Sequence, residues 1–288
     1  MPELPEVETV KRGLTKVLPG QKIISFSSDT PKMLNYSPAK FQAKIIGRQI
    51  KVVDRCGKMI IIKLNGQLDL LAHLKMTGQL VYQDKIRQLG GGHQIKSGGL
   101  QLPNKFSHII LGFKNGGKLY FNDIRKFGWL KLFTDRELDH YLAGLKLGPE
   151  PLEKGFTLNY FQTALARRPK VKIKQFLMDN SNVVGIGNIY SDEICFFAGV
   201  RPDRPAGQLT GTEVKKLYRG INKILKEAIN CHGTSVSDYV DAQGRVGSYA
   251  KKLKVYQRYG KKCYNCGAII KKMKIGGRTA SFCPHCQV

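Results

Sequence analysis

Two pairs of cysteines near the end of the chain constrain its fold more than any other feature of the sequence. Cys263 and Cys266 form one Cys-x-x-Cys pair, Cys283 and Cys286 form a second, and 16 residues separate the pairs. This spacing is typical of a tetrahedral zinc site with four cysteine ligands on a β-hairpin. Two disulfides are the alternative, which the regular spacing disfavours. Because four thiolates leave no position open for water, we expect one structural Zn²⁺ ion with no catalytic role.

The charge of the chain indicates a polyanionic partner. Forty-eight Lys and Arg oppose 21 Asp and Glu, which gives a net charge of +27. Nucleic acid is the commonest partner of such a protein. We find no amphipathic anchor, no apolar run of about 18–20 residues and no apolar leader, so we expect no membrane partner. The three cysteines outside the zinc pairs are expected to be reduced thiols, which is typical of a cytoplasmic protein.

The first half of the chain has the pattern of an antiparallel β-structure. Asn65-Gly66 and Asn115-Gly116-Gly117 predict hairpin turns, because Asn and Gly accept positive φ at little cost. The glycine-rich stretch 90–105 is expected to be a surface loop. The recurring strands predict a sandwich or flattened barrel over residues 22–133. Three segments rich in β-branched residues are the clearest strands: 22–27, 49–53 and 59–64.

The second half has helical spacing from residue 157 onward, after a short helix at 136–147 and a proline-rich connection. Two short helices precede residues 184–193, where two glycines interrupt the pattern and a helix restarts. Such a turn exposes backbone N–H groups that suit a phosphate, although the signal alone is weak. Thr210 and Glu213 predict a capping box before a helix at 214–229, whose lysines we interpret as a solvated face.

The amino terminus, Met-Pro-Glu-Leu-Pro-Glu-Val-Glu-Thr-Val, offers a candidate nucleophile. Apolar residues from Leu4 to Val17 recur at helical spacing. Proline and carboxylates are common at helix starts, so spacing alone favours a purely structural role. Removal of Met1 would leave Pro2 as a secondary amine, of which about a tenth is unprotonated at neutral pH. Such an amine can attack an aldehyde-like sugar carbon, and Glu3 is placed to move protons.

These ten residues resemble the opening of bacterial formamidopyrimidine-DNA glycosylases, of the formamidopyrimidine/endonuclease VIII family. The run Gly-Ile-Gly-Asn-Ile-Tyr-Ser-Asp-Glu at 185–193 is similar to the helix–two-turn–helix signature of that family. The resemblance covers nearly the whole chain. It implies a base excision repair enzyme that acts, as a monomer associated with the nucleoid, on double-stranded DNA containing damaged bases.

The resemblance also implies an activity. A bifunctional DNA glycosylase/AP lyase would excise oxidised purines such as 8-oxoguanine and formamidopyrimidines through a Schiff base at Pro2, and cleave the strand by β,δ-elimination. One alternative is an endonuclease VIII-like enzyme for oxidised pyrimidines, which Leu4 and the pair Arg125 and Phe127 disfavour. The other is a non-catalytic zinc-ribbon protein that binds nucleic acid.

The catalytic residues implied by the resemblance are Pro2, Glu3 and Lys58, the last of which would grip the phosphate of the damaged nucleotide. Cys56 departs from the basic residue expected near this lysine. Met76, Arg125 and Phe127 would fill the gap left by an everted base. We expect Arg125 and Phe127 to point to the same side of an extended strand.

Further DNA contacts are implied outside this wedge. His73 resembles a phosphate-contacting histidine, with a structural role as its rival. Lys174 resembles a lysine implicated in processing of the damaged base. Asn188 would bind the DNA backbone. Arg278 follows Gly276-Gly277 at the expected hairpin tip, where a guanidinium can bind a phosphate through two hydrogen bonds.

Together these patterns predict an α+β fold with two domains. We expect an N-terminal antiparallel β-sandwich with a leading helix, and a C-terminal helical domain with a helix–two-turn–helix and a four-cysteine zinc ribbon. The expected boundaries are a catalytic sandwich domain at 1–134, a linker at 135–155, a helical domain with a lesion-capping loop at 156–250, and the zinc ribbon at 251–288.

Overall fold

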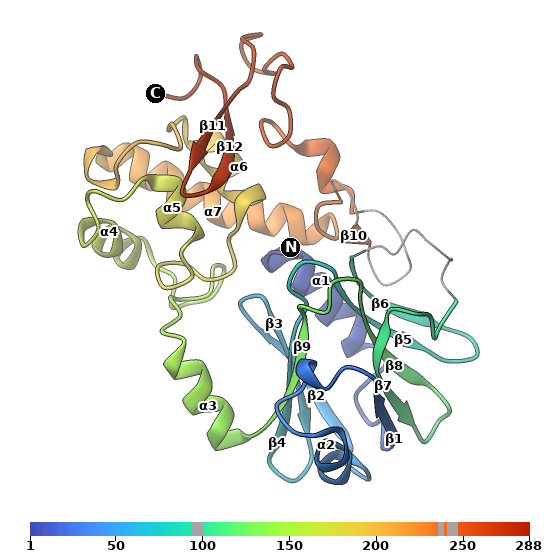
Figure 1. Cartoon of the computed structure of the whole chain (residues 1–288). Helices are drawn as coiled ribbons and strands as arrows, with labels where there is room; N and C mark the ends of the chain where they lie inside the picture. Colours follow the sequence, from blue (N-terminus) through green and yellow to red (C-terminus); the bar gives the residue numbers. More distant parts are fainter. Residues whose placement is uncertain (94–100, 236–238, 241–246) are drawn as a thin grey trace. The chain divides into compact units, whose positions relative to one another are not determined.

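The chain forms two compact units in the computed structural model (Figure 1). One unit contains residues 1–144 and 231–250, and the other contains residues 145–230 and 251–288. Within the residues that the structure describes, no helix is both long and apolar enough to cross a membrane. The described residues are 1–93, 101–235, 239–240 and 247–288.

Two antiparallel sheets form the frame of the first unit. The larger sheet has the strand order β1-β7-β8-β5-β6-β10, and the smaller sheet has the order β2-β3-β4-β9. Their bounds are β1 (Ile23–Ser28), β2 (Ile50–Cys56), β3 (Met59–Leu64), β4 (Leu68–His73), β5 (Gly78–Gln83), β6 (Gln88–His93), β7 (Ser107–Phe113), β8 (Lys118–Asp123), β9 (Trp129–Thr134) and β10 (Tyr239–Val240).

A single apolar core joins the two sheets. Ile60, Ile62 and Leu70 from the smaller sheet and Leu80 and Leu111 from the larger one belong to one cluster of buried residues. Removal of this apolar surface from water is the main driving force for the unit. The predicted antiparallel sandwich is therefore confirmed, together with both predicted hairpin turns, between β3 and β4 and between β7 and β8.

The expected surface loop at 90–105 is wrong for its first residues, because Gly90 and Gly92 belong to strand β6. This strand pairs with β5 along its length. A Cβ atom at Gly90 would lie 2.0 Å from the carbonyl oxygen of Leu80, so the close approach of β5 requires glycine here. Residues 94–100 of the expected loop lie outside the described part of the chain.

Helices cover and extend the first unit. The leading helix α1 (Leu4–Thr15) is the predicted one, and its apolar positions Val7, Val10 and Leu14 are buried in the sandwich core. The other elements are η1 (Pro31–Met33), α2 (Pro38–Ile45), α3 (Asp135–Gly144) and η3 (Tyr249–Lys252).

Residues 231–250 also belong to the first unit, although the domain boundaries predicted from the sequence placed them in the helical domain at 156–250. Strand β10 pairs with β6, and the amide of Thr234 donates a hydrogen bond to Glu6 in α1. A lesion-capping loop was expected in this region. Residues 236–238 and 241–246 of that region lie outside the part of the chain that the structure describes.

Helices and one hairpin form the second unit. Thr210 and Glu213 make the predicted reciprocal capping bonds at the start of α7. The elements are α4 (Leu158–Ala166), α5 (Ile173–Met178), α6 (Asn188–Ala198), η2 (Ala206–Gln208), α7 (Gly211–Asn230), β11 (Lys271–Ile275) and β12 (Arg278–Phe282). The turn between α5 and α6 gives the expected helix–two-turn–helix arrangement.

Candidate active site

The amino terminus is fixed by a buried carboxylate four residues beyond the candidate nucleophile. Pro2, Glu3 and Glu6 are all buried. Glu6 accepts two hydrogen bonds of 2.8 Å, one from the amide of Glu3 and one from the amide of Thr234. Glu6 therefore fixes the start of α1 and ties it to the segment after α7. The sequence contained this residue within the family-like opening but gave no signal of its long-range partner.

A second network ties α1 to the turn that carries Lys58. Arg55 donates to the carbonyl of Gly57 at 3.0 Å and to the carboxylate of Glu8 at 3.1 Å. Burial alone would raise the pKa of Glu8, but hydrogen bonds from Arg12 and Arg55 outweigh it and hold this pKa below its usual value. Glu8 is therefore ionised at neutral pH and anchors the turn before the buried Lys58.

The residues expected to act as a wedge are organised by Asp123, a fully buried carboxylate at the end of β8. One carboxylate oxygen accepts hydrogen bonds from the Thr77 hydroxyl and from the amide of Arg125 at 3.1 Å. The other oxygen accepts from the amides of Phe127 at 2.9 Å and Gly128 at 2.6 Å. Because Thr77 follows Met76 directly, this single side chain holds both wedge-bearing segments.

The expectation that Arg125 and Phe127 lie on an extended strand is wrong. They lie in the loop between β8 and β9, where Lys126 has a φ of +54°. The two side chains are nevertheless neighbours, because the Arg125 guanidinium lies 4.5 Å from the centre of the Phe127 ring. Phe127 is 51% exposed and Met76 is 39% exposed, so large apolar surface faces solvent at both segments.

His73, at the end of β4, is held in its neutral form. Burial lowers the pKa of His73 to about 3, and the charges of Lys75 and Lys58 add to this effect. Its Nδ1 accepts a 2.9 Å hydrogen bond from the amide of Lys75, which leaves the proton on Nε2. The imidazole can therefore donate one hydrogen bond but supplies no positive charge.

Asn188 and Arg278 line one groove of the second unit, with a volume of about 680 Å³. The Oδ1 atom of Asn188 is buried and has no hydrogen-bond partner among the described residues. Asn188 is the first residue of α6, where N–H groups and the helix dipole favour an anion. The groove is also lined by Tyr256, Tyr259, Lys272 and Lys274, and no acidic side chain lines it.

Glu193 fixes one wall of this groove. Its carboxylate accepts hydrogen bonds from the amides of three successive residues, Lys254, Val255 and Tyr256, at 2.8 to 3.0 Å. The structure gives it a structural role at the segment that leads into the zinc module.

Lys174 does not lie where it could contact DNA. Its side chain is fully buried, and its ammonium group bonds to the carboxylate of Asp192 at 2.5 Å and to the carbonyl of Thr279 at 3.2 Å. Asp192 also accepts from the amide of Ser281. This buried pair joins α5, α6 and β12. We therefore replace the expected DNA contact of Lys174 with a structural role.

The four cysteines of the predicted zinc site meet at one point. Their sulfur atoms all lie within 4.8 Å of one another. The sulfurs of Cys266 and Cys283 are 3.5 Å apart and those of Cys263 and Cys286 are 3.9 Å apart, whereas a disulfide needs about 2.05 Å, and all four cysteines are free. Zn–S bonds of about 2.3 Å in a tetrahedron require sulfurs about 3.8 Å apart, so the site fits Zn²⁺.

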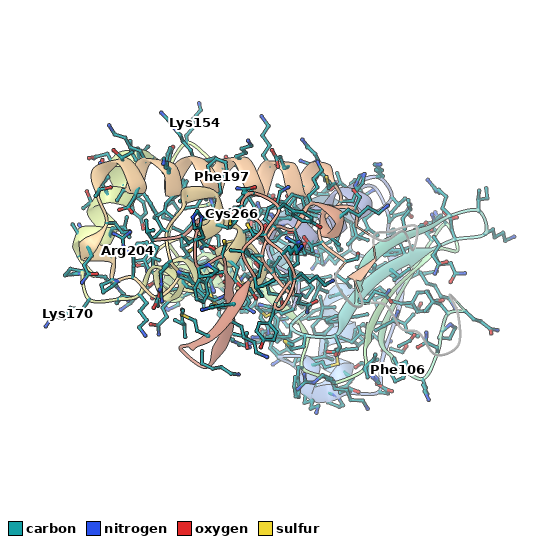
Figure 2. All side chains as sticks on the ribbon, turned by 90° about the horizontal axis from the view of Figure 1, so that it is seen from above. Phe106, Lys154, Lys170, Phe197, Arg204 and Cys266 are labelled. Carbon is teal, nitrogen blue, oxygen red and sulfur yellow. The ribbon has the colours of Figure 1, made fainter. Side chains whose placement is uncertain are left out.

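Backbone amides complete the zinc site. Asn265 donates to the sulfur of Cys263 and Cys286 donates to the sulfur of Cys283, at 3.4 and 3.3 Å. These bonds stabilise thiolates, which are the form that binds the ion. Because four cysteines complete the coordination, the zinc is structural and holds the β11–β12 hairpin, with Arg278 at its tip. Figure 2 labels Cys266, one of the ligands.

Three family models match the chain in order. They are the formamidopyrimidine-DNA glycosylase N-terminal domain over residues 1–130, the formamidopyrimidine-DNA glycosylase H2TH domain over residues 147–240, and the zinc finger found in FPG and IleRS over residues 260–288. The formamidopyrimidine-DNA glycosylase of Pelotomaculum thermopropionicum is 41% identical over 100% of this chain and 99% of its own. The enzyme of Listeria monocytogenes is 38% identical, with both chains covered completely.

Solved structures agree with these matches. The Lactococcus lactis Fpg in complex with an abasic-site DNA superimposes with a TM-score of 0.87, at 34% identity and 99% coverage of both chains. The wild-type Lactococcus lactis Fpg bound to a DNA containing N7-benzyl-Fapy-dG gives the same values. With its zinc site, its sandwich and its helix–two-turn–helix in the family order, the chain belongs to the formamidopyrimidine-DNA glycosylase family of DNA repair enzymes.

Proposed function

We propose that this enzyme is a bifunctional glycosylase and AP lyase that removes oxidised purines, with Pro2 as its nucleophile. The observation that carries the proposal is the buried Pro2-Glu3 pair at the start of α1, where Glu6 fixes the Glu3 amide. A nucleophile that must attack one sugar carbon gains from such fixed geometry. The proposal requires removal of Met1, since Pro2 nitrogen is otherwise part of an amide.

The chemistry begins with attack of the Pro2 nitrogen on C1′ of the damaged nucleotide. The bond between C1′ and the base breaks, and the base leaves with the electron pair and takes up a proton. Glu3 supplies and accepts the protons that this step and ring opening of the sugar require. The resulting iminium makes the C2′ protons acidic, so loss of one expels the 3′ phosphate. A second elimination expels the 5′ phosphate and leaves a gap of one nucleotide.

Recognition of the damaged base uses the two segments that Asp123 holds. Met76, Arg125 and Phe127 would fill the space of the everted nucleotide, as inserted side chains do in enzymes that flip bases. Their exposure and the rigid attachment of both segments support this role. Lys58 and the Nε2–H group of His73 would bind phosphates of the damaged strand.

The second unit would bind the DNA backbone through Asn188 and Arg278. The absence of acidic side chains among the lining residues of their groove supports this assignment. Relatives that bind abasic-site and Fapy-containing DNA support damaged duplex DNA as the substrate. All of these residues come from one chain, which supports action as a monomer. The enzyme would act on the bacterial chromosome in the cytoplasm.

Insertion of one alanine between Met1 and Pro2 tests the nucleophile. The insertion keeps every side chain but leaves Pro2 nitrogen in an amide bond. We expect cleavage of a duplex with 8-oxoguanine opposite cytosine to be lost, while affinity for that duplex is kept. Unchanged strand cleavage would rule out Pro2.

A comparison of lesions tests the substrate class. We expect the enzyme to excise 8-oxoguanine faster than thymine glycol from otherwise identical duplexes. The reverse order would assign the chain to the branch that repairs oxidised pyrimidines.

A further inference from the structure

One face of helix α7 carries a row of basic side chains that the proposed function does not use. All five cations are exposed: Lys215, Lys216, Arg219, Lys223 and Lys226. From Lys216 onward they are spaced three or four residues apart, and Lys215 lies four residues before Arg219, so they share one side of the helix. The opposite face is buried in the second unit, through residues that include Leu217, Ile221, Ile224 and Leu225. We call these five cations the α7 basic face.

The α7 basic face has no acidic counterpart. Of the two carboxylates on the helix, Glu213 is bound to Arg204 at 2.5 Å, and Glu227 makes no ion pair in the described part of the chain. The second unit as a whole has 24 Lys and Arg against eight Asp and Glu. Like charges three or four residues apart destabilise a helix. The α7 basic face therefore opposes folding, and an external polyanion would relieve that cost.

An aromatic ring lies in the middle of this face. Phe197, near the end of α6, is 40% exposed, and the ammonium group of Lys223 lies 5.3 Å from the ring centre. The ring crosses α7 at Gly220, where an added Cβ would lie 2.8 Å from it. Figure 2 shows Phe197 beside this helix. One aromatic ring among five cations is far less apolar surface than the centre of a protein–protein interface.

The α7 basic face is separate from the groove of Asn188 and Arg278. No residue of α7 lines that groove. Asn188 begins α6 and Phe197 lies nine residues later, so about 13 Å of helix separates them. Binding of a duplex by the groove residues therefore uses none of the five cations of the α7 basic face.

From this arrangement we propose that the α7 basic face is a second DNA-binding surface, which holds the phosphate backbone of another duplex segment without reading its sequence. From Lys215 to Lys226 the helix rises about 16 Å, which matches about five base-pair steps of a duplex. The surface would let an enzyme bound at a lesion retain a second segment of DNA. The proposal needs DNA binding at the groove but not the Pro2 chemistry.

The test is retention of a second duplex by enzyme whose first site is filled. A biotinylated duplex with a stable abasic-site analogue, in excess over the full-length enzyme, immobilises it, and a fluorescent undamaged duplex is then offered. The wild type is expected to retain the fluorescent duplex at low salt. The variant Lys216→Gln/Arg219→Gln/Lys223→Gln is expected to lose this retention. Loss of three phosphate contacts should reduce the steepness of log affinity against log salt concentration by about 2.7. Between 50 and 200 mM salt, the affinity of the variant should therefore fall about 40-fold less than that of the wild type.

A matched variant separates position from total charge. Lys154→Gln/Arg167→Gln/Lys170→Gln removes three exposed cations from other parts of the same unit and should retain the second duplex. Equal losses in the two variants, or no retention by the wild type, would overturn the proposal. Retention of polyglutamate in place of the fluorescent duplex would also overturn it, in favour of an acidic protein partner. Cleavage of the lesion duplex, measured separately, reports on the proposed function and should be unchanged in both variants.

Discussion

Replacement of Asp123 by asparagine should disconnect the wedge segments while leaving the sandwich core intact. The substitution keeps the size of the side chain but removes its charge and turns one acceptor oxygen into a donor NH2 group. Four donors now converge on the carboxylate: the Thr77 hydroxyl and the amides of Arg125, Phe127 and Gly128. Thr77 and Arg125 donate to one carboxylate oxygen, and Phe127 and Gly128 donate to the other. An asparagine has a single oxygen, so it can accept hydrogen bonds from only one of these two pairs of donors.

The least costly orientation of Asn at this position points its oxygen at the amides of Phe127 and Gly128. The NH2 group then faces two groups. The Thr77 hydroxyl can rotate and accept a hydrogen bond from it. The N–H of Arg125 loses its bond to residue 123 but keeps its 3.1 Å bond to the Thr77 oxygen. One hydrogen bond is lost and two others lose their charged acceptor. Hydrogen bonds to charged groups contribute about 1.5–3 kcal/mol and neutral ones about 1 kcal/mol, so the change should cost about 2–4 kcal/mol.

Two assays measure this effect. The free energy of unfolding of the first unit should fall by the amount given above in urea denaturation. Excision of 8-oxoguanine under single-turnover conditions should slow by about 10- to 100-fold, because displacement of the wedge by about 1 Å is enough for a loss of this size.

Asp84→Asn is the matched control. Asp84 accepts bonds from the amides of Ile86 at 2.9 Å and Arg87 at 2.7 Å, in the turn between β5 and β6. This variant should lose stability without slowing excision. The assignment of Asp123 as the residue that positions the wedge would be refuted by either of two results. One is an excision rate of Asp123→Asn equal to that of the wild type, and the other is an equally reduced excision rate in Asp84→Asn.

Three further changes test the amino terminus, a buried carboxylate of β4 and the zinc site. Glu6→Gln should slow covalent trapping of the enzyme on lesion DNA by at least about tenfold, because one amide cannot accept from both Glu3 and Thr234, and an unchanged rate would count against this link. Burial raises the pKa of Asp69, in β4, to about 6. Between about pH 4 and 6 the folded chain therefore keeps a proton on this carboxyl that the unfolded chain has already released. As a result, the free energy of unfolding falls as the pH rises through that window. Asp69→Asn should remove that slope and raise stability at pH 7 by about 1–3 kcal/mol in urea denaturation, whereas an unchanged slope would contradict the raised pKa. Removal of zinc with a chelator should abolish DNA binding, since the hairpin that carries Arg278 loses its support, and unchanged affinity of the metal-free protein would disprove this dependence.

Local signals in the sequence predicted those parts of the fold that depend on neighbours in the chain. The cysteine spacing gave the zinc site, Thr210 and Glu213 gave the helix cap, and Asn-Gly pairs gave the hairpin turns. Each of these rests on geometry within a few residues or on a fixed ligand spacing. The antiparallel sandwich followed from the number and spacing of short strands.

The errors came from contacts between different segments of the fold, which local sequence patterns do not encode. Gly90 and Gly92 have the composition of a loop, but the backbone of β5 approaches too closely for any side chain. Asp123 accepts hydrogen bonds from amides two to five residues later, but its fourth donor, the Thr77 hydroxyl, lies 46 residues earlier, and no local pattern indicated that contact. Lys174 looked like a DNA contact by resemblance, whereas Asp192, 18 residues later, buries it in an ion pair. A motif gives the residue type, but only the fold gives the partner.

The measurement that tests the central claim most directly is borohydride trapping on a duplex with one 8-oxoguanine opposite cytosine. Reduction of the imine joins enzyme to DNA irreversibly, and peptide mapping then identifies the attached residue. The account predicts a covalent adduct on Pro2, at a chain end from which Met1 has been removed. An adduct on a lysine, or binding of the lesion duplex without any adduct, would contradict it.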